Sequence, residues 1–157
     1  MVDWQIAIRL IAAVVVGGLL GLNRELAGKP AGFRTHVLVC LGAATAAVAA
    51  LHSRGGAVID PNAAGRVVQG VLTGIGFLGA GVILRDPAGH ISGLTTAATV
   101  WICAVIGFVS AVANWGLLAL VFVLTMIALA IGGAVERFTD RLFSRRNPQG
   151  NTNESKS

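Results

Sequence analysis

Apolar and polar residues alternate in long blocks along this 157-residue chain. Five blocks are almost wholly apolar, covering residues 6–22, 37–51, 67–84, 97–113 and 115–134. Each approaches the roughly 20 residues with which a helix crosses the ~30 Å hydrocarbon core of a bilayer. The pattern therefore predicts an all-α integral membrane protein built as a bundle of five transmembrane helices.

The third apolar run differs from the others in its glycine content, with Gly70, Gly74, Gly76, Gly79 and Gly81. Small residues let the backbones of membrane helices approach closely, so this run is expected to be the packing centre. Gly17 and Gly21 show the same spacing of four in the first run. The alternative is a helix broken between Gly74 and Gly81, with free carbonyls lining a cavity as in transporters. A surplus glycine face could also form a homodimer.

The arrangement of basic residues predicts an orientation in the membrane. Only Asn114 separates the fourth and fifth runs, which indicates a tight turn between antiparallel helices. Five spans place the termini on opposite sides, and nine of the twelve Lys and Arg residues then share the side of the C-terminus. Because cytoplasmic segments are enriched in Lys and Arg, we expect the N-terminus outside and the C-terminus in the cytoplasm. Loops 23–36 and 85–96 would then both face the cytoplasm.

Composition supports a membrane protein and argues against a nucleic-acid partner. The chain is 55% hydrophobic and 12% charged, against about 25% charged residues in soluble domains. Its pI of about 10.6 could suggest nucleic acid, but the basic residues flank apolar runs without forming a stripe with aromatics. They suit anionic lipid headgroups, so the expected partner is the lipid bilayer. Cys40 and Cys103 lie inside apolar runs and are expected to be buried free thiols.

The apolar pattern also sets the expected domain limits. Residues 1–135 should form one transmembrane domain, followed by a basic and polar cytoplasmic tail over residues 136–157. Residues 136–143 could continue the fifth helix, and the chain from residue 144 onward is expected to be disordered.

The two loops on the expected cytoplasmic side carry a candidate polar cluster: Arg24, Glu25, Arg34, His36, Arg85, Asp86, Thr95 and Thr96. These residues could form a fixed ion-pair network, or they could be solvated charges that flank the spans. Thr95 or Ser92 would suit the N-cap of the fourth helix. Glu25 and Asp86 could offer oxygens to Mg²⁺, which often takes one or two carboxylates, although pairing with nearby arginines is the stronger expectation.

Other polar residues give fewer leads. Arg9 lies inside the first span, where a charge is a functional candidate, but it is near one end and could extend to the membrane surface. His36, His52 and His90 lie in or beside three different loops and form no nucleophile–base set. We therefore predict no catalytic residues, no enzyme activity and no cofactor apart from a weak Mg²⁺ candidate.

With these residues set out, the chain resembles the transmembrane domain of the MgtC/SapB family. The resemblance covers roughly residues 9–133, through RL at 9–10, GLNRE at 21–25, AGFRTH at 31–36, GIGFLGAGVI at 74–83 and GLTTAAT at 93–99 with Trp101. Some members have Asn where Thr95 stands, or Cys directly after the tryptophan, where this chain has Ile102 before Cys103. Many continue into an ACT-like cytoplasmic domain, which this sequence does not include.

The resemblance implies a bacterial inner-membrane protein linked to growth at low magnesium, stress survival and, in pathogens, virulence inside host cells. Two functions are consistent with it. The first is a non-enzymatic regulator that acts through helix contacts with a second copy or with another membrane protein, such as the ATP synthase. The second is a transporter or channel for Mg²⁺ or another cation, which would need a dimer because five spans are few for one pore.

Overall fold

Five helices form most of the computed structural model, which describes residues 3–51, 61–85 and 91–146. In chain order the elements are α1 (Trp4–Leu26), α2 (Phe33–Leu51), α3 (Pro61–Gly81), β1 (Leu84–Arg85), β2 (Ile91–Ser92), α4 (Leu94–Ala111) and α5 (Trp115–Arg146). Within these residues, α1, α2, α4 and the segment Trp115–Val135 of α5 are long and apolar enough to cross a membrane. The prediction of an all-α membrane protein is confirmed; its orientation remains a prediction.

Helix α3 is not among those four apolar helices. Its glycines and its polar start lower its mean hydropathy, and the helix ends at Gly81. Residues 82–84, which the sequence pattern assigned to the third span, therefore lie beyond the helix. They lead into a short antiparallel ladder, in which Leu84 pairs with Ser92 and Arg85 with Ile91. Two-residue strands leave no periodic signal, so the sequence did not predict them.

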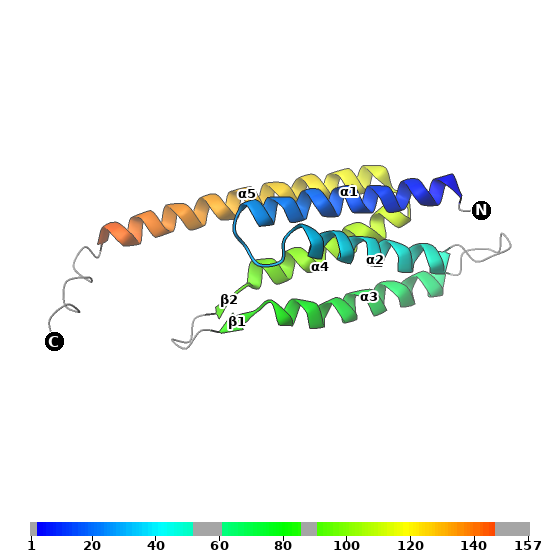
Figure 1. Ribbon diagram of the computed structural model, residues 1–157, viewed down its shortest axis with the longest axis horizontal. Coiled ribbons are helices and arrows are strands. Elements are labelled where there is room, and N and C mark those ends of the chain that lie inside the picture. Colours follow the sequence, from blue (N-terminus) through cyan, green and yellow to red (C-terminus); the bar gives the residue numbers. More distant parts are fainter. Residues whose placement is uncertain (1–2, 52–60, 86–90, 147–157) are drawn as a thin grey trace. The chain divides into compact units, whose positions relative to one another are not determined.

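The chain divides into two units, residues 1–122 and residues 123–157. In the first unit, α2 and α4 lie at the centre, and each contacts the other one as well as α1 and α3 (Figure 1). The α1–α2 loop and the β1–β2 ladder lie at the same end of this unit, which we call the hairpin end. Their shared position agrees with the prediction that loops 23–36 and 85–96 occupy one side.

Local sequence explains where the helices begin and end. The Asp3 carboxylate accepts a hydrogen bond from the backbone N–H of Gln5, 3.2 Å away, and caps α1. The α1–α2 connection turns through Ala31, at φ 58°. Between α4 and α5, Ala113 has φ 54°, and the Asn114 side chain accepts a hydrogen bond from the N–H of Leu117 at 3.1 Å. The predicted tight turn at Asn114 is thus confirmed.

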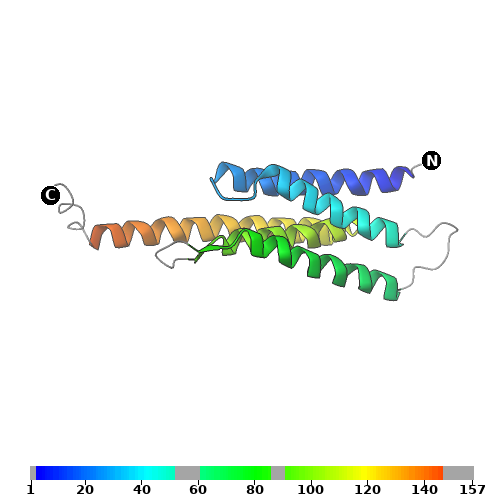
Figure 2. The ribbon, with the colours of Figure 1, turned by 60° about the horizontal axis from the view of Figure 1, so that its bottom comes forward.

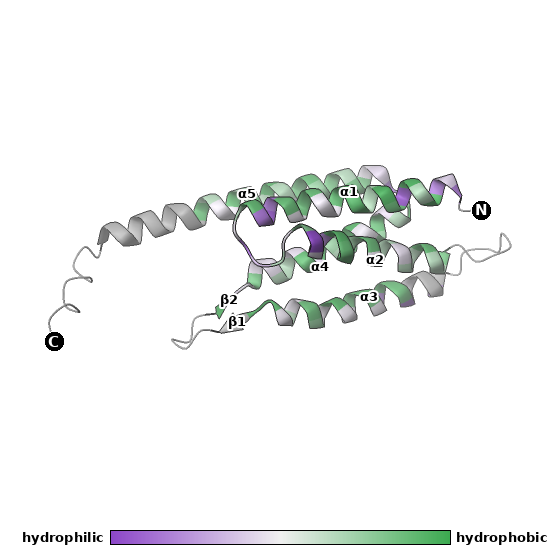
Figure 3. Cartoon of the chain, viewed as in Figure 1, coloured by the Kyte–Doolittle hydropathy of each residue, from purple (hydrophilic) through white to green (hydrophobic). Residues whose placement is uncertain are grey.

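Hydrophobic residues predominate along much of the length of the helices (Figure 3). Large side chains such as Ile11, Val15, Leu19 and Leu38 are exposed, as hydrocarbon-facing residues would be. More hydrophilic positions occur near the ends of α1 and at the start of α2. This distribution is the reverse of a soluble protein's surface and fits a bilayer environment.

Close helix packing occurs at glycines of α1 and α4. A Cβ at Gly17 would lie 2.7 Å from the Cβ of Cys40, and one at Gly21 would lie 2.7 Å from the Cα of Phe33. The predicted packing roles of Gly17 and Gly21 are therefore confirmed. Gly107 on α4 has the tightest approach within a helix, because its added Cβ would overlap the backbone carbonyl of Cys40. Sequence reasoning missed Gly107.

The prediction that the third span is the packing centre is wrong for the described unit. Four of its five glycines, Gly70, Gly74, Gly76 and Gly81, have no atom within 4 Å of an added Cβ. Gly79 alone makes an ordinary contact, 3.7 Å from the Cβ of Ala97. Helix α3 (green in Figure 2) instead packs through Ile75 and Val71 onto α2 and α4, whereas Gly70, Gly74 and Gly81 make no contact there.

The expected tail is helical over its first part. Helix α5 continues through Arg146, three residues beyond the extension that the sequence suggested. Residues 136–143 continue the helix as the sequence suggested, and residues 144–146 are helical where disorder was expected. Residues 147–157 lie outside the described residues.

Gly107→Ala should destabilise the α2–α4 contact, because its methyl group would overlap the Cys40 carbonyl. Overpacking of this kind costs about 1–3 kcal/mol. Thermal unfolding in detergent should therefore show a lower Tm. Gly42→Ala on α2 is the matched control, since an added Cβ there has no neighbour within 4 Å. Equal stability of the two variants would contradict the assigned contact.

Candidate functional site

A buried hydrogen bond connects the two loops at the hairpin end. The guanidinium Nη2 of Arg24, in the last turn of α1, donates to the hydroxyl oxygen of Thr96 in the first turn of α4 at 3.0 Å. Arg24 is only 5% exposed and Thr96 only 1% exposed. A positive charge in the last turn of α1 also interacts favourably with that helix's dipole. The two residues thus join α1 to α4 inside the unit.

His36 lies in the same buried region and contributes from α2. Its Nδ1 is 2.9 Å from the carbonyl oxygen of Gly32, and because a carbonyl only accepts, Nδ1 carries the proton. The imidazole is fully buried, and its Nε2 has no hydrogen-bond partner in the described part of the chain. Arg24 is close enough to act on it electrostatically. We call Arg24, His36 and Thr96 the inner polar cluster.

Glu25 fixes the turn between α1 and α2. Its Oε2 accepts a hydrogen bond from the backbone N–H of Phe33, the first residue of α2, at 2.8 Å. Gly32 allows this approach, because a Cβ there would lie 2.8 Å from the same oxygen. The carboxylate therefore caps the start of α2, where the helix dipole also favours a negative charge.

Two further members of the predicted cluster lie at the surface, outside the inner polar cluster. Arg34 and Thr95 are exposed. Arg85 belongs to β1, and Asp86 lies outside the described residues. The N-cap of α4 is Gly93, without a side-chain cap, so the prediction that Thr95 or Ser92 caps this helix is wrong. Gly93 has φ 89° and lies against the Val82 carbonyl, so a side chain there would be both strained and blocked.

Arg9 has a structural partner at the opposite end of the unit. Its Nη1 donates to the backbone carbonyl oxygen of Ala111, the last residue of α4, at 2.9 Å. This bond satisfies one of the carbonyls that a helix leaves free at its C-terminus, and the charge complements the dipole there. Arg9 thus binds a neighbouring helix. The sequence had suggested either a functional charge in the membrane or a side chain that extends to the membrane surface, and neither includes this contact.

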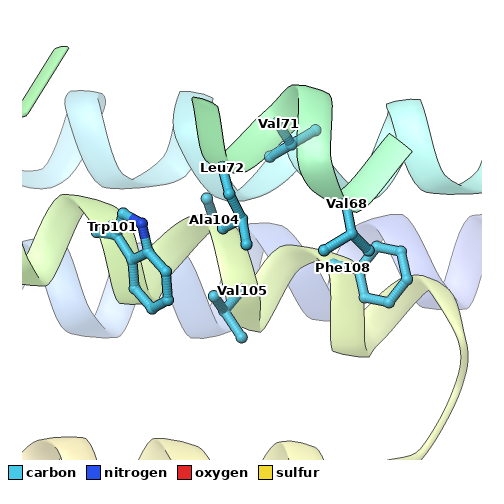
Figure 4. Close-up of a pocket in the computed structure, with 7 residues that line it drawn as sticks. All are labelled: Val68, Val71, Leu72, Trp101, Ala104, Val105 and Phe108. Carbon is cyan, nitrogen blue, oxygen red and sulfur yellow. The ribbon is translucent and has the colours of Figure 1, made fainter. Parts of the chain in front are cut away.

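An apolar pocket of about 220 Å³ lies between α3 and α4 (Figure 4). Its lining comes from both helices and consists of Val68, Val71, Leu72, Trp101, Ala104, Val105 and Phe108. Trp101 also lines a second hollow of about 360 Å³, beside Gly76 and Gly79. Neither hollow contains a charged side chain, so they suit apolar contacts and not ion coordination.

The described residues offer little for metal or bond-making chemistry. They contain no group of three or more His, Cys, Asp or Glu side chains that could hold a metal ion. The Mg²⁺ candidate from the sequence paired Glu25 with Asp86; Glu25 caps α2, and Asp86 is outside the described part. What the inner polar cluster does is join α1 to α4 at the hairpin end, with the buried His36 of α2 beside them.

Comparison with known proteins identifies relatives for most of the chain. The model of the MgtC family matches residues 10–138. Protein SrpB of Synechococcus elongatus is 42% identical over 137 residues, which cover 80% of this chain and 75% of SrpB. The putative magnesium transporter YhiD of Escherichia coli K12 and Protein MgtC of Salmonella typhimurium are each 38% identical.

The last two relatives are much longer than the matching region. The alignment covers 67% of this chain but 50% of YhiD, and 68% of this chain but 43% of MgtC. No solved structure matches this chain.

Thr96→Val should destabilise the unit, because it removes the acceptor of a buried charged donor while keeping the side-chain shape. Hydrogen bonds to charged groups contribute about 1.5–3 kcal/mol. Denaturant titration of the purified protein in mixed micelles should show a lower midpoint. Thr95→Val is the matched control because Thr95 is exposed, and Thr96→Ser should retain most of the stability. A Thr96→Val midpoint equal to that of Thr95→Val would refute the role of this bond.

Proposed function

Because this chain belongs to the MgtC family, we propose that it is a non-enzymatic protein of the bacterial inner membrane that acts by helix–helix contact. In this proposal the open face of α3 binds a second copy of the chain, and the resulting dimer supports growth at low magnesium. The observation that carries the proposal is the exposed glycine and polar surface of α3, described next.

The open face of α3 is poorly suited to lipid. Gln69 and Thr73 are exposed on it, and Gly70, Gly74 and Gly76 leave the helix backbone uncovered. In hydrocarbon, Gln and Thr side chains favour hydrogen bonds with another helix, and glycines favour close helix approach. The exposed faces of α1 and α2 instead carry many large apolar side chains. A protein partner on α3 would remove this mismatch.

The same face combines one large side chain with several glycines, which suits a self-associating surface. Phe77 is 82% exposed, and it lies on one helical stripe with Gly70, Gly74 and Gly81. A two-fold interface uses the same patch on both copies, so each projection must fit a hollow of the partner. A phenylalanine among glycines on one stripe meets this condition and supports a second copy as the partner.

The shape of α3 bears on the alternative of transport. A transporter of the kind expected from the sequence would break this helix between Gly74 and Gly81, yet α3 is a continuous α-helix through Gly81. Hydrogen bonds that span three residues instead of four appear only beyond the helix. The N–H of Val82 donates to the Gly79 carbonyl, and the N–H of Ile83 donates to the Ala80 carbonyl. A continuous helix therefore favours a packing role for α3 and not the opening that transport would need.

Transport of Mg²⁺ is the second candidate function, favoured by the similarity to a protein named as a putative magnesium transporter. The polar hairpin end would then receive the ion, with Asp86 as the acidic residue nearest the end of α3 in sequence. This candidate needs a path that α3 does not open, so we rank it below helix contact.

A photo-crosslinking amino acid at Phe77 should join two copies in intact membranes. Two versions of the chain with different affinity tags are expressed together, and the crosslinked species should carry both tags. The matched control is Leu38 on α2, which is 68% exposed and should label lipid. The double variant Gly70→Leu/Gly74→Leu should abolish the crosslink and the rescue of growth at low Mg²⁺, whereas Gly42→Leu should retain both.

Two results would argue against this dimer. Equal crosslinking from Leu38 would show that contact with α3 is not specific. A Phe77 adduct that contains a different membrane protein and never a second copy would keep helix contact but replace the partner.

Purified protein in liposomes loaded with a Mg²⁺-sensitive dye should give no more Mg²⁺ entry than empty liposomes. The physical reason is that continuous α3 provides no polar path across the hydrocarbon. Entry that depends on the protein and falls with Asp86→Asn would establish transport in place of the first proposal.

A further inference from the structure

The two cysteines of the chain meet between α2 and α4. Both are free and fully buried. The thiol of Cys103 donates to the backbone carbonyl oxygen of His36, with 3.2 Å between Sγ and O. His36 precedes Cys40 by one helical turn of α2, so the Cys103 thiol lies against α2 one turn before Cys40.

The backbones around this thiol pair are close enough for a covalent bridge. Gly107, one turn after Cys103, lies so near that its added Cβ would overlap the Cys40 carbonyl and lie 3.1 Å from the Cys40 Cα. Native disulfides need Cα atoms about 4.4–6.8 Å apart, with the side chains directed toward each other. Cys103 contacts α2 one turn before Cys40, and Gly107 contacts α2 at Cys40, so the two cysteines are offset by about one helical turn, or ~5.4 Å, along helices in backbone contact.

The pair lies within the apolar length of both helices. Cys40 is the eighth residue of α2 and Cys103 the tenth of α4, so both thiols lie about 10–14 Å along their helices at 1.5 Å per residue. Both helices are long and apolar enough to span a membrane. A water-soluble oxidant would therefore have to leave water to reach the sulfurs, whereas a lipid-soluble one is already in the same phase.

We propose that Cys40 and Cys103 form a reversible disulfide that locks α2 to α4, and that the oxidant is a membrane quinone. Each thiol loses one electron and one proton, the S–S bond forms, and the quinone takes up two electrons and two protons to become the quinol. A dithiol reverses the reaction by thiol–disulfide exchange. No metal ion is needed at any step.

The disulfide would join the two central helices of the unit. Helices α2 and α4 each contact both α1 and α3, so a bond between them restrains every other helix contact there. The bridge also closes a long loop, from residue 40 to residue 103, and such loops gain the most from crosslinking in the chain-entropy model. Oxidation would thus add a covalent bond to the central helix contact of the unit.

The test counts free thiols in the full chain, reconstituted in lipid nanodiscs. The protein is reduced, the reductant is removed, and decylubiquinone is added. The sample is then denatured in SDS with a maleimide-linked polyethylene glycol that adds mass for each free thiol. We expect two labels before oxidation, none afterwards, and two again after dithiothreitol. The protein should stay at monomer mass without reductant, and its Tm should rise by about 5–15 °C.

Variants and a second oxidant decide between outcomes. Cys40→Ser and Cys103→Ser should each keep one label after quinone treatment and gain no stability. Two labels retained by the unaltered chain after both decylubiquinone and copper–phenanthroline would overturn the bridge. A bridge formed with copper–phenanthroline alone would overturn the assignment of the quinone. Disulfide-linked dimers from the single-cysteine variants would overturn the intramolecular pairing.

Discussion

At Cys40 the backbone of α2 touches the backbone of α4, and the rest of the described unit depends on this contact. Gly107 makes it possible, since any side chain there would overlap the Cys40 carbonyl. Gly17 of α1 approaches Cys40 from another side, within 2.7 Å of its Cβ for an added methyl group. Lipid tails are as apolar as the side chains, so helices in a membrane associate through close packing and hydrogen bonds. One cysteine flanked by two glycines meets that requirement for three helices.

Close packing fixes the distance between helices, and the polar residues fix their register. Arg24 and Arg9 lie toward opposite ends of α1, and each donates to α4: the first to the Thr96 side chain, the second to the Ala111 carbonyl. Unsatisfied polar groups are costly in hydrocarbon, so sliding α1 along α4 would break both bonds without replacement by water. Two arginines about one helix length apart therefore hold α1 and α4 in a single alignment, which glycine packing alone would leave free.

The sequence predicted the number of helices, the turn at Asn114 and the shared end of the two polar loops, because each follows from hydrophobic run length or backbone connectivity. It indicated the close packing at Gly17 and Gly21, but it wrongly made the glycines of the third run the packing centre and missed Gly107. Spacing shows that a helix can approach a neighbour closely, but it does not identify the neighbour. Gly107 and Ala111 also show the spacing of two small residues four positions apart, so the sequence did carry a signal for close packing at Gly107. All three members of the inner polar cluster were among the eight predicted residues. The sequence could not show which of the eight would be buried together, since side-chain direction at the hairpin end depends on how α1 and α4 meet.

The glycines of α3 take on a different meaning once Gly17, Gly21 and Gly107 account for the packing of the unit. A helix that needed glycine only to fit its own bundle would place it toward α2 and α4, where α3 instead uses Ile75 and Val71. Glycine on the opposite side weakens the helix and exposes its backbone to lipid. The thiol pair lies inside the unit and the α3 face outside it, so locking α2 to α4 would leave the surface proposed for the second copy uncovered. Regulation within one copy and association between copies can therefore be separated experimentally.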